Sequence, residues 1–556
     1  QKLWNSEYAL PYNDFYEVYK ERYNIIKHQR EIAKSEEIPS LEKYRLKPNS
    51  MQERFIANLR KILERGEERA LLISATGTGK TYASAFAMRE LGFKRVLFLV
   101  HRVTLAKQAK NSFEKVFDKK VTMGLVGAGS YEYEKDYVFA TVETLNRDTH
   151  LFQYQPDAFD CIILDEAHHS SNNIYTKVID YFNPKLFLGM TATPDKRDDN
   201  QEGKNIYEIF HYQIAHEIRL QQAMEDNLLC PFHYFGVSEV ISLDDKTWQA
   251  TKLTDDEFNQ LTSDERVKHV IEQSEYYGYS GDRVRGLIFC SRVKECEELS
   301  RKFNALGYRT IALSGADSEE KRQKAFERLA MDEADTTEEM QPLDYIFSRD
   351  ILNEGVDIVE VNQVIMLRPT QSAIVFVQQL GRGLRKADGK EYVVVLDFIG
   401  NYNNNFLIPI ALSGDRTYNK DNVRKYVREG VRVIPGSSTI HFDEITKKKI
   451  FESIDKMTTT KRMLTDKYNQ VKYKLGRIPT ILDFYKLGEI DPMLFIKYAK
   501  TYDSFLRIVD KDYNITFTDK EEQILAFVSA LIIDGKRPHE LLMLKMMLEG
   551  TNIEEN

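Results

Sequence analysis

One segment constrains the fold of this chain more than any other: the octapeptide from Ser74 to Thr81, with the sequence S-A-T-G-T-G-K-T. It follows an apolar run at 70–73 and precedes a stretch typical of a helix. A strand, a glycine-rich loop and a helix in this order form a phosphate cradle, because the glycines let successive backbone N–H groups turn toward one anion. The positive end of the helix dipole near Lys80 favours the same anion. The segment therefore predicts an α/β fold that binds a nucleotide.

The residues of this loop have distinct expected roles. Lys80 supplies a positive charge for the β- and γ-phosphates, and the Thr81 hydroxyl reaches Mg²⁺. The general pattern has a glycine five residues before Gly79, and this chain has Ser74 at that position. The residues expected to contact the nucleotide are Thr76, Gly77, Thr78, Gly79, Lys80 and Thr81.

A second signal is the sequence D-E-A-H at 165–168, which follows the apolar run 161–164. A buried parallel strand reads as a continuous apolar run, and ligands bind at the carboxyl ends of such strands. We expect Asp165 to face the same site as Lys80 and to hold Mg²⁺ through water, and Glu166 to orient or deprotonate the attacking water. The alternative is an acidic helix start after a strand. The presence of the phosphate loop favours the catalytic interpretation.

A third signal is the sequence Q-Q-L-G-R-G-L-R at 378–385, far from the phosphate loop along the chain. Arg382 and Arg385 are three residues apart, and so lie on one face of a helix. An arginine supplied from a second domain can neutralise the charge that develops on a transferring phosphoryl group. Taken alone, this segment would be read as a solvated basic turn.

In this order, the three segments resemble the superfamily 2 helicases. Other segments resemble further motifs of that family, and they are 98–102 with Leu105 and Gln108 (motif Ia), 141–145 (motif Ic), 191–194 (motif III), 287–292 (motif IV) and 351–358 (motif V). Residues 46–48 with Gln52 look like a diverged adenine-recognition motif. The resemblance covers roughly 46–397 and is nearest to the type III restriction and XPB-like branch, which also has a D-E-A-H box.

The resemblance implies that ATP and Mg²⁺ bind between two similar domains and that the second domain completes the site. The catalytic residues that it implies are Lys80, Asp165, Glu166, Gln378, Arg382 and Arg385, with Thr81 and Asp165 on the metal. Further nucleotide contacts are expected from Gln52, Gly355 and Asp357. Contacts to nucleic acid are expected from Arg102, Thr141, Thr144, Ser291 and Arg292.

Alternating strand-like and helical segments predict two RecA-like, doubly wound parallel-sheet domains in tandem, with helical extensions at both ends. The expected boundaries are 1–45 for a helical extension, 46–215 for the ATP-binding domain, 216–282 for a helical connector, 283–415 for the second domain and 416–556 for a mostly helical accessory region.

The segment 397–453 resembles a group of bacterial helicases that carry a C-terminal domain of unknown function. Members of this group often carry a phospholipase-D-type nuclease at the N-terminus, which needs the pattern H-x-K-x4-D. That pattern does not occur in this sequence, and the sequence does not begin with Met. We therefore expect a fragment, or a relative without the nuclease, which then is a candidate partner.

Composition sets weaker limits. The net charge is −8, so a nucleic-acid site would be a local basic surface on an acidic chain. No apolar run approaches the roughly 20 residues of a membrane span. The four cysteines have no metal-ligand spacing, which fits a reducing cytoplasm.

The function that the resemblance implies is that of a nucleic-acid-stimulated ATPase. We expect an ATP-dependent DNA helicase or translocase, acting in defence against foreign DNA or in DNA repair. Three alternatives stay open: a duplex translocase that does not separate strands, an RNA helicase, and a nucleotide-gated scaffold or sensor that regulates a partner nuclease. The presence of every catalytic residue type argues against the scaffold.

Overall fold

The computed structural model describes most of the chain from residue 47 onward. The described residues are 47–117, 121–127, 129–169, 173–194, 205–241, 253–337, 340–349, 358–369, 381, 383–387, 389–400, 402–429, 438–531 and 538–550. The expectations for 1–45 and for Gly355, Asp357, Gln378 and Arg382 lie outside these residues. Among the described helices, none has the length and apolar character needed to cross a membrane.

The first domain is built on an eight-stranded sheet. Its strands are β1 (Arg69–Ser74), β2 (Val96–Val100), β3 (Met123–Gly127), β4 (Ser130–Tyr131), β5 (Tyr137–Thr141), β6 (Cys161–Asp165), β7 (Leu186–Thr191) and β8 (Ile214–Ile218). They lie in the order β4-β3-β5-β2-β6-β7-β1-β8. All neighbours are parallel except β3 and β4, which form an antiparallel hairpin.

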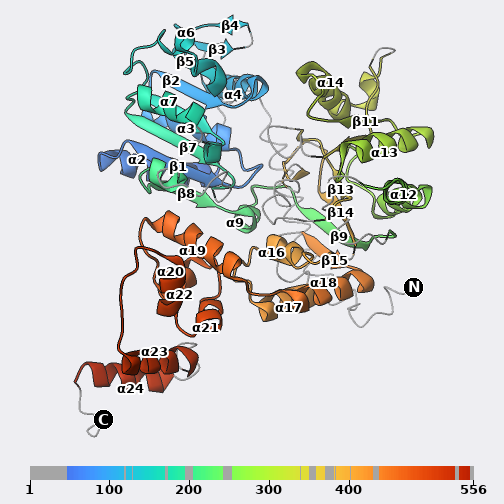
Figure 1. Ribbon diagram of the computed structural model, residues 1–556. Coiled ribbons are helices and arrows are strands. Elements are labelled where there is room, and N and C mark those ends of the chain that lie inside the picture. Colours follow the sequence, from blue (N-terminus) through green and yellow to red (C-terminus); the bar gives the residue numbers. More distant parts are fainter. Residues whose placement is uncertain are drawn as a thin grey trace, which may run out of the picture. The chain divides into compact units, whose positions relative to one another are not determined.

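Successive residues of the central strands enter two different apolar cores. Leu72, Phe98 and Ile163 belong to one core, whereas their neighbours Leu71 and Leu97 belong to the other. This follows from the period of two in a strand, and it requires apolar residues at nearly every position. Figure 1 shows helices on both faces; they are α2 (Ser50–Glu64), α3 (Lys80–Leu91), α4 (Val103–Val116), α5 (Val142–Leu145), α6 (Asp148–Leu151), α7 (Asn173–Tyr181) and α8 (Ile206–Ile209).

The second domain is built on a seven-stranded sheet that is parallel throughout. The strands are β9 (Phe232–Ser238), β10 (Gly286–Phe289), β11 (Thr310–Leu313), β12 (Tyr345–Ser348), β13 (Gln363–Met366), β14 (Val393–Ile399) and β15 (Thr439–Phe442), in the order β11-β12-β10-β13-β14-β9-β15. Its helices include α12 (Asp264–Tyr277), α13 (Val293–Ala305) and α14 (Glu319–Ala330). The prediction of two doubly wound parallel sheets in tandem is confirmed.

The prediction of a wholly helical connector over 216–282 is wrong in two places. Residues up to Ile218 belong to β8, which pairs with β1, and the helix that follows, α9 (Leu220–Glu225), is short. Strand β9 also lies in the predicted connector, yet it pairs with β14 and β15. Both segments become strands because neighbouring strands satisfy their backbone hydrogen bonds, so tertiary pairing overrides local preference. The helical remainder consists of α11 (Asp255–Leu261) and α12.

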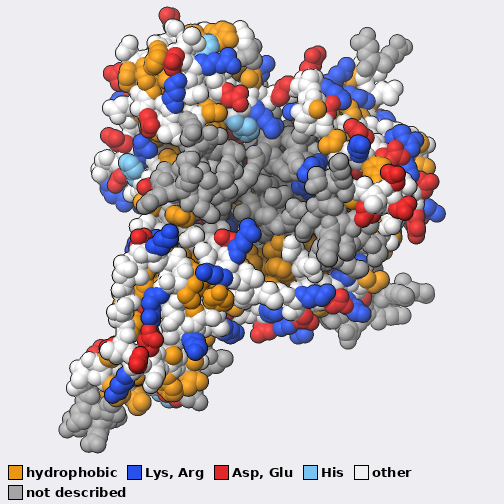
Figure 2. Space-filling model, viewed as in Figure 1, with side chains coloured by type: hydrophobic (Ala, Val, Ile, Leu, Met, Phe, Trp, Pro, Cys, Tyr) orange, Lys and Arg blue, Asp and Glu red, His pale blue; other side chains and the backbone are white. Residues whose placement is uncertain are grey.

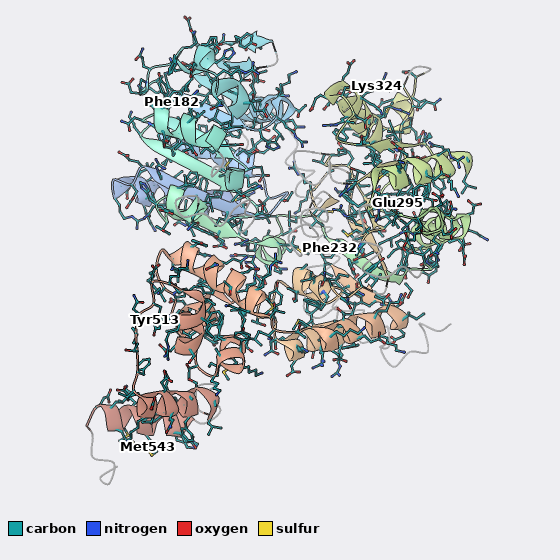
Figure 3. All side chains as sticks on the ribbon, viewed as in Figure 1. Phe182, Phe232, Glu295, Lys324, Tyr513 and Met543 are labelled. Atoms are coloured by element: carbon teal, nitrogen blue, oxygen red, sulfur yellow. The ribbon has the colours of Figure 1, made fainter. Side chains whose placement is uncertain are left out.

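The C-terminal region is helical apart from β15. It contains α16 (Leu407–Ser413), α17 (Lys420–Glu429), α18 (Glu444–Lys456), α19 (Lys461–Leu475), α20 (Ile481–Leu487), α21 (Met493–Ala499), α22 (Tyr502–Val509), α23 (Asp519–Leu531) and α24 (Pro538–Leu548). Helices α19 to α22 enclose a separate core that includes Leu464, Phe484 and Phe505. The expected helical C-terminal extension is confirmed. Figure 3 labels Met543 on α24 and Tyr513 just after α22.

A buried carboxyl in β14 makes the stability of the second domain depend on pH. Asp397 is buried and accepts a hydrogen bond from the Tyr234 hydroxyl at 2.6 Å. Burial raises the pKa of Asp397 to about 7, from an ordinary value of 3.8. The unfolded chain therefore loses this proton at lower pH than the folded chain, and stability present below pH 3.8 is lost as the pH rises toward 7.

We expect Asp397→Asn to remove this contribution, because the amide oxygen still accepts the bond from Tyr234 but does not ionise. The free energy of unfolding of the variant minus that of wild type should therefore increase by on the order of 4 kcal/mol as the pH rises from 4 to 8. Urea unfolding followed by circular dichroism at several pH values measures this difference. A difference that is constant with pH would contradict the assignment.

Candidate functional site

The glycine-rich loop between β1 and α3 has the backbone of a phosphate cradle. Gly77 and Gly79 have φ values of +91° and +84°, a region that side chains disfavour. A Cβ atom on Gly77 would meet Leu229 Cδ2 at 3.0 Å, and one on Gly79 would meet Gln52 Nε2 at 3.1 Å. Helix α3 begins directly after Gly79, so its first N–H groups face the loop. The conformation fits a phosphate held by backbone N–H groups.

Ser74, the departure from the general pattern, has a local structural role. Its buried hydroxyl lies 2.5 Å from the Thr78 hydroxyl, which in turn donates to the Ala75 carbonyl at 2.7 Å. The Ser74 carbonyl accepts a hydrogen bond from Lys80 Nζ at 3.2 Å. Two hydroxyls and one lysine thus connect the start of the loop with its end.

Gln52 lies beside the loop, but both ends of its amide are engaged. Its Oε1 accepts from the backbone N–H of Asn49 at 2.9 Å in the capping box of α2. Its Nε2 donates to the Gly79 carbonyl at 3.3 Å. The contact connects α2 to the cradle, and adenine recognition by Gln52 stays a prediction.

Asp165 ends β6, separated from β1 by β7 alone. Burial and the neighbouring Glu166 raise the pKa of the Asp165 carboxyl, whereas Lys80, a hydrogen bond from the Glu166 N–H and Arg385 lower it. Burial and Glu166 both disfavour the ionised form of this carboxyl. A divalent cation would offset both effects, so the environment is suited to one. In the described part of the chain, no group of three or more His, Cys, Asp or Glu side chains could hold a metal ion, so Mg²⁺ fits here only together with nucleotide phosphates.

Glu166 has an unusual backbone conformation, with φ of +49°. Such a φ is rare for a residue with a side chain and is typical of functional positions, where surrounding structure maintains it. Glu166 Oε2 lies 3.3 Å from His168 Nδ1, and that nitrogen lies 3.0 Å from the Thr191 hydroxyl. Thr191 also accepts from the backbone N–H of Thr193 at 3.1 Å. His168 therefore connects the D-E-A-H segment to the end of β7, a role that the sequence motif alone did not indicate.

Arg385, from the second domain, lies against the phosphate loop of the first. Its Cγ is 3.4 Å from the position that a Cβ on Gly77 would occupy, and the Gly381 carbonyl oxygen is 3.8 Å from it. Its charge also lowers the pKa of Asp165. The backbone adds a nearby connection, because the Cys230 N–H donates to the Leu384 carbonyl at 2.8 Å. The two sequence segments at 74–81 and 378–385 are thus brought together at Gly77.

The residues expected to contact nucleic acid lie at the carboxyl ends of strands in both domains. Arg102 follows β2 and is the N-cap of α4. Thr141 ends β5, and its hydroxyl lies 2.8 Å from that of Thr144. Ser291 and Arg292 follow β10, and Arg292 Nη1 donates to the Ser291 hydroxyl at 3.1 Å. Their contacts with a polymer stay predictions.

A buried triad of charged side chains, Glu239, Arg266 and Glu295, holds Ser291 in place. Glu295, on α13 and labelled in Figure 3, accepts from both the N–H and the hydroxyl of Ser291, at 2.9 and 2.6 Å. Its other oxygen accepts from Arg266 of α12 at 2.9 Å, and Arg266 also binds Glu239 at 2.8 Å. Burial disfavours the charged guanidinium, but the two carboxylates outweigh it and raise the pKa of Arg266. Sequence reasoning missed this triad because its members are separated in the chain and carry no motif.

Arg266 also holds the backbone at the end of helix α11 and just after strand β13. It donates to the carbonyls of Leu261 at 2.8 Å and of Leu367, just after β13, at 3.0 Å. The triad therefore fixes the loops after β9, β10 and β13 relative to one another.

Comparison with known proteins agrees with this geometry. Residues 45–196 match the family model for the type III restriction enzyme, res subunit, and residues 267–387 match the helicase conserved C-terminal domain. Residues 464–556 match a domain of unknown function, DUF8090. That match begins downstream of 397–453, the segment that suggested such a domain.

Two curated relatives and one solved structure illustrate the similarity. IRC3, a candidate ATP-dependent helicase of Saccharomyces cerevisiae, is 26% identical over 364 residues, which cover 61% of this chain and 49% of the relative. The type I restriction enzyme EcoAI endonuclease subunit of Escherichia coli is 26% identical over 374 residues, covering 60% and 44%. The type ISP restriction-modification enzyme LlaBIII bound to DNA superposes with a TM-score of 0.51 at 18% identity, covering 87% of this chain and 39% of that one.

The chain thus spans about half the length of the curated relatives that it matches. It contains the two RecA-like domains of a superfamily 2 helicase, and the first of them matches the model for a restriction-enzyme subunit.

The phosphate cradle makes a direct prediction. Gly77→Ala should abolish ATP binding, because the added methyl would meet Leu229 in a strained backbone conformation beside the phosphate site. Gly92→Ala is the matched control, since Gly92 also has a positive φ, +73°, but a Cβ there meets nothing within 4 Å. Titration with a fluorescent ATP analogue measures both. Equal affinity in the two variants would refute the cradle.

The buried triad predicts a loss of stability. Arg266→Met leaves the carboxylates of Glu239 and Glu295 buried without a cation, which should lower the free energy of unfolding by about 3–5 kcal/mol. Arg301→Met, at an exposed ion pair of α13, should change it little. Chemical denaturation followed by circular dichroism makes the comparison, and similar midpoints for the two variants would contradict the role of the triad.

Proposed function

We propose that this protein is an ATP-driven motor that moves along DNA, with ATP hydrolysed at a site to which both RecA-like domains contribute. The observation that carries the proposal is the position of Arg385 against Gly77 of the phosphate loop. A guanidinium from one domain beside the phosphate cradle of the other makes hydrolysis depend on how the domains are arranged. ATP turnover can in this way be coupled to domain movement.

The roles of the site residues follow from their chemistry. The cradle and Lys80 bind the phosphates, and Thr81 and Asp165 hold Mg²⁺, which neutralises charge on the phosphate oxygens. Glu166, next to Asp165 and close to His168, orients or deprotonates the attacking water. Arg385, with Gln378 and Arg382 as further candidates, stabilises the charge of the transition state. Gly355 and Asp357 are candidates to connect this site to the polymer.

DNA is the proposed track. The match of 45–196 to a restriction-enzyme subunit and the similarity to the EcoAI endonuclease subunit favour DNA over RNA. Contacts from Arg102, Thr141, Thr144, Ser291 and Arg292 would be mostly to phosphate and sugar, and so tolerant of sequence and sensitive to salt. A role in defence against foreign DNA, with a nuclease as partner, is consistent with the same similarity, and cytoplasmic localisation is part of this proposal.

Steady-state ATP hydrolysis tests the proposal. The protein is assayed alone and with single-stranded DNA, duplex DNA or RNA, with Lys80→Ala as the inactive control. Stimulation by one polymer, lost in the control, would support the motor and identify its track. ATP binding without turnover under any condition would instead favour the nucleotide-gated scaffold. Strand-displacement and triplex-displacement assays then separate a helicase from a duplex translocase.

The contribution of the second domain is tested with one side chain. Arg385→Ala should retain ATP binding and reduce the rate of hydrolysis by roughly 10³-fold or more, as expected for an arginine that acts on the transition state. Glu166→Gln should also bind ATP without turning it over. Arg301→Ala, at an exposed position of α13, should behave as wild type. Normal hydrolysis by Arg385→Ala would refute a site shared by two domains.

A further inference from the structure

An aromatic stack on the first domain extends the surface predicted to contact nucleic acid. Tyr131 of β4 stacks on the ring of His150 of α6, with centroids 5.0 Å apart and planes 5° apart. The side chain of Tyr131 is 51% exposed even though one face of its ring is covered. Such a fixed ring with an open face is a surface on which a planar group can stack.

The ring beneath Tyr131 is held in place by its neighbours. His150 Nδ1 lies 2.6 Å from the Tyr133 hydroxyl, and Tyr133 packs edge-on against Tyr154, which is buried. Tyr133 is also close to parallel with Tyr131, at 19° and 6.2 Å. The support therefore extends from the exposed ring into the core of the domain.

The backbone that carries Tyr131 is equally constrained. Tyr131 pairs with Val126 in the β3–β4 hairpin. The next residue, Glu132, donates its N–H to the Leu125 carbonyl at 3.0 Å, and its carboxylate accepts from the Leu125 N–H at 3.0 Å. A ring on a fixed hairpin loses little conformational entropy when a ligand stacks on it.

The stack adjoins the end of β5, where the sequence predicts contacts to nucleic acid. The hairpin passes close to Thr144, because a Cβ on Gly127 would lie 3.2 Å from the Thr144 hydroxyl. Arg147 follows, with its N–H donating to the Thr144 carbonyl at 3.2 Å. His150 comes three residues later in α6, the helix for which Arg147 is the N-cap. Figure 1 shows β4 and α6 close together on this edge of the sheet.

One basic side chain on this strip suits a phosphate. Arg147 is exposed, and its guanidinium forms no ion pair with any residue in the described ranges. The nearby Asp148 carboxylate is bound by Lys177 at 2.7 Å, so its negative charge is offset. In Figure 2, hydrophobic, basic and acidic side chains lie along the same upper edge of the first domain. Along this strip, the hydroxyls of Thr141 and Thr144 are followed by the guanidinium of Arg147 and then by the open face of the Tyr131 ring.

We propose that Tyr131, supported by His150 and Tyr133, is a stacking platform for a base of single-stranded DNA, with Arg147 binding an adjacent phosphate. This inference rests on the proposed function, because it assumes that a DNA strand passes the carboxyl end of β5. It adds a contact that reads the planar face of a base rather than the phosphate backbone. Every base has such a face, so the contact is independent of sequence.

The experiment compares two labelled oligonucleotides of equal length, a thymidine homopolymer and one whose sugars lack bases, by fluorescence anisotropy with a non-hydrolysable ATP analogue. Tyr131→Ala should weaken binding of the homopolymer about 5- to 100-fold and leave binding of the baseless strand unchanged. Tyr131→Phe should bind as wild type, because it retains the ring. Circular dichroism melting of each variant verifies that the hairpin folds.

Two further variants make the test specific. Phe152, directly after α6, is 60% exposed but packs against Tyr181 at 60°, so Phe152→Ala is the matched control and should bind normally. Arg147→Ala should weaken binding of both strands and reduce the slope of log K against log salt by about one. Tyr131→Ala should leave that slope unchanged.

Each result has a defined meaning. If wild type binds the homopolymer and Tyr131→Ala binds it equally well, the platform is refuted while the proposed function stands. If Tyr131→Ala weakens binding of the baseless strand as well, the residue acts through the fold and not by stacking. If wild type binds neither strand but duplex DNA stimulates its ATP hydrolysis, the platform is refuted while the proposed function stands, and if no DNA stimulates hydrolysis the proposed function fails as well.

Discussion

The parallel pairing of β1 between β7 and β8 is the constraint on which the rest of the structure depends. It holds the phosphate loop at the carboxyl edge of the sheet, and it places Asp165 and Thr191, which end β6 and β7, at the same edge. Parallel strands direct their carboxyl ends to one side, so residues distant in sequence meet there. Successive apolar residues of these strands enter two different cores, and this packing on both faces of the sheet holds the edge in place.

The second domain is also built on a parallel sheet. In this domain, buried charged side chains fix the loops that follow the strands. The triad of Glu239, Arg266 and Glu295 ties the loops after β9, β10 and β13 together. A buried ion pair contributes little net stability, since desolvation opposes the Coulombic attraction, but removing one member is costly. The triad therefore fixes the geometry of these loops, among them the loop that presents Ser291, more than it stabilises the sheet.

The described surface of the first domain presents two kinds of side chain that the proposed function would use. Hydroxyls and arginines at the carboxyl ends of β2 and β5 suit phosphates, whereas the exposed ring of Tyr131 suits a base. A motor that moves along DNA needs contacts that tolerate every sequence, and phosphate binding and base stacking both meet this requirement. The phosphate loop after β1 and the strip after β5 lie at the ends of strands of one sheet, with β2, β6 and β7 between them.

The sequence alone determined the two parallel sheets and the segments that form the site. Continuous apolar runs fix buried parallel strands, and the glycines of 74–81 admit few backbone conformations, so both patterns are local and readable. Tertiary structure alone decided what becomes of 214–218 and 232–238, because only pairing with β1, β14 and β15 makes them strands. It also decided the approach of Arg385 to Gly77, the bridge through His168, the Arg266 triad and the Tyr131 stack. Each of these joins side chains distant in the chain, and such contacts depend on packing in three dimensions, which leaves no periodic signal in the sequence.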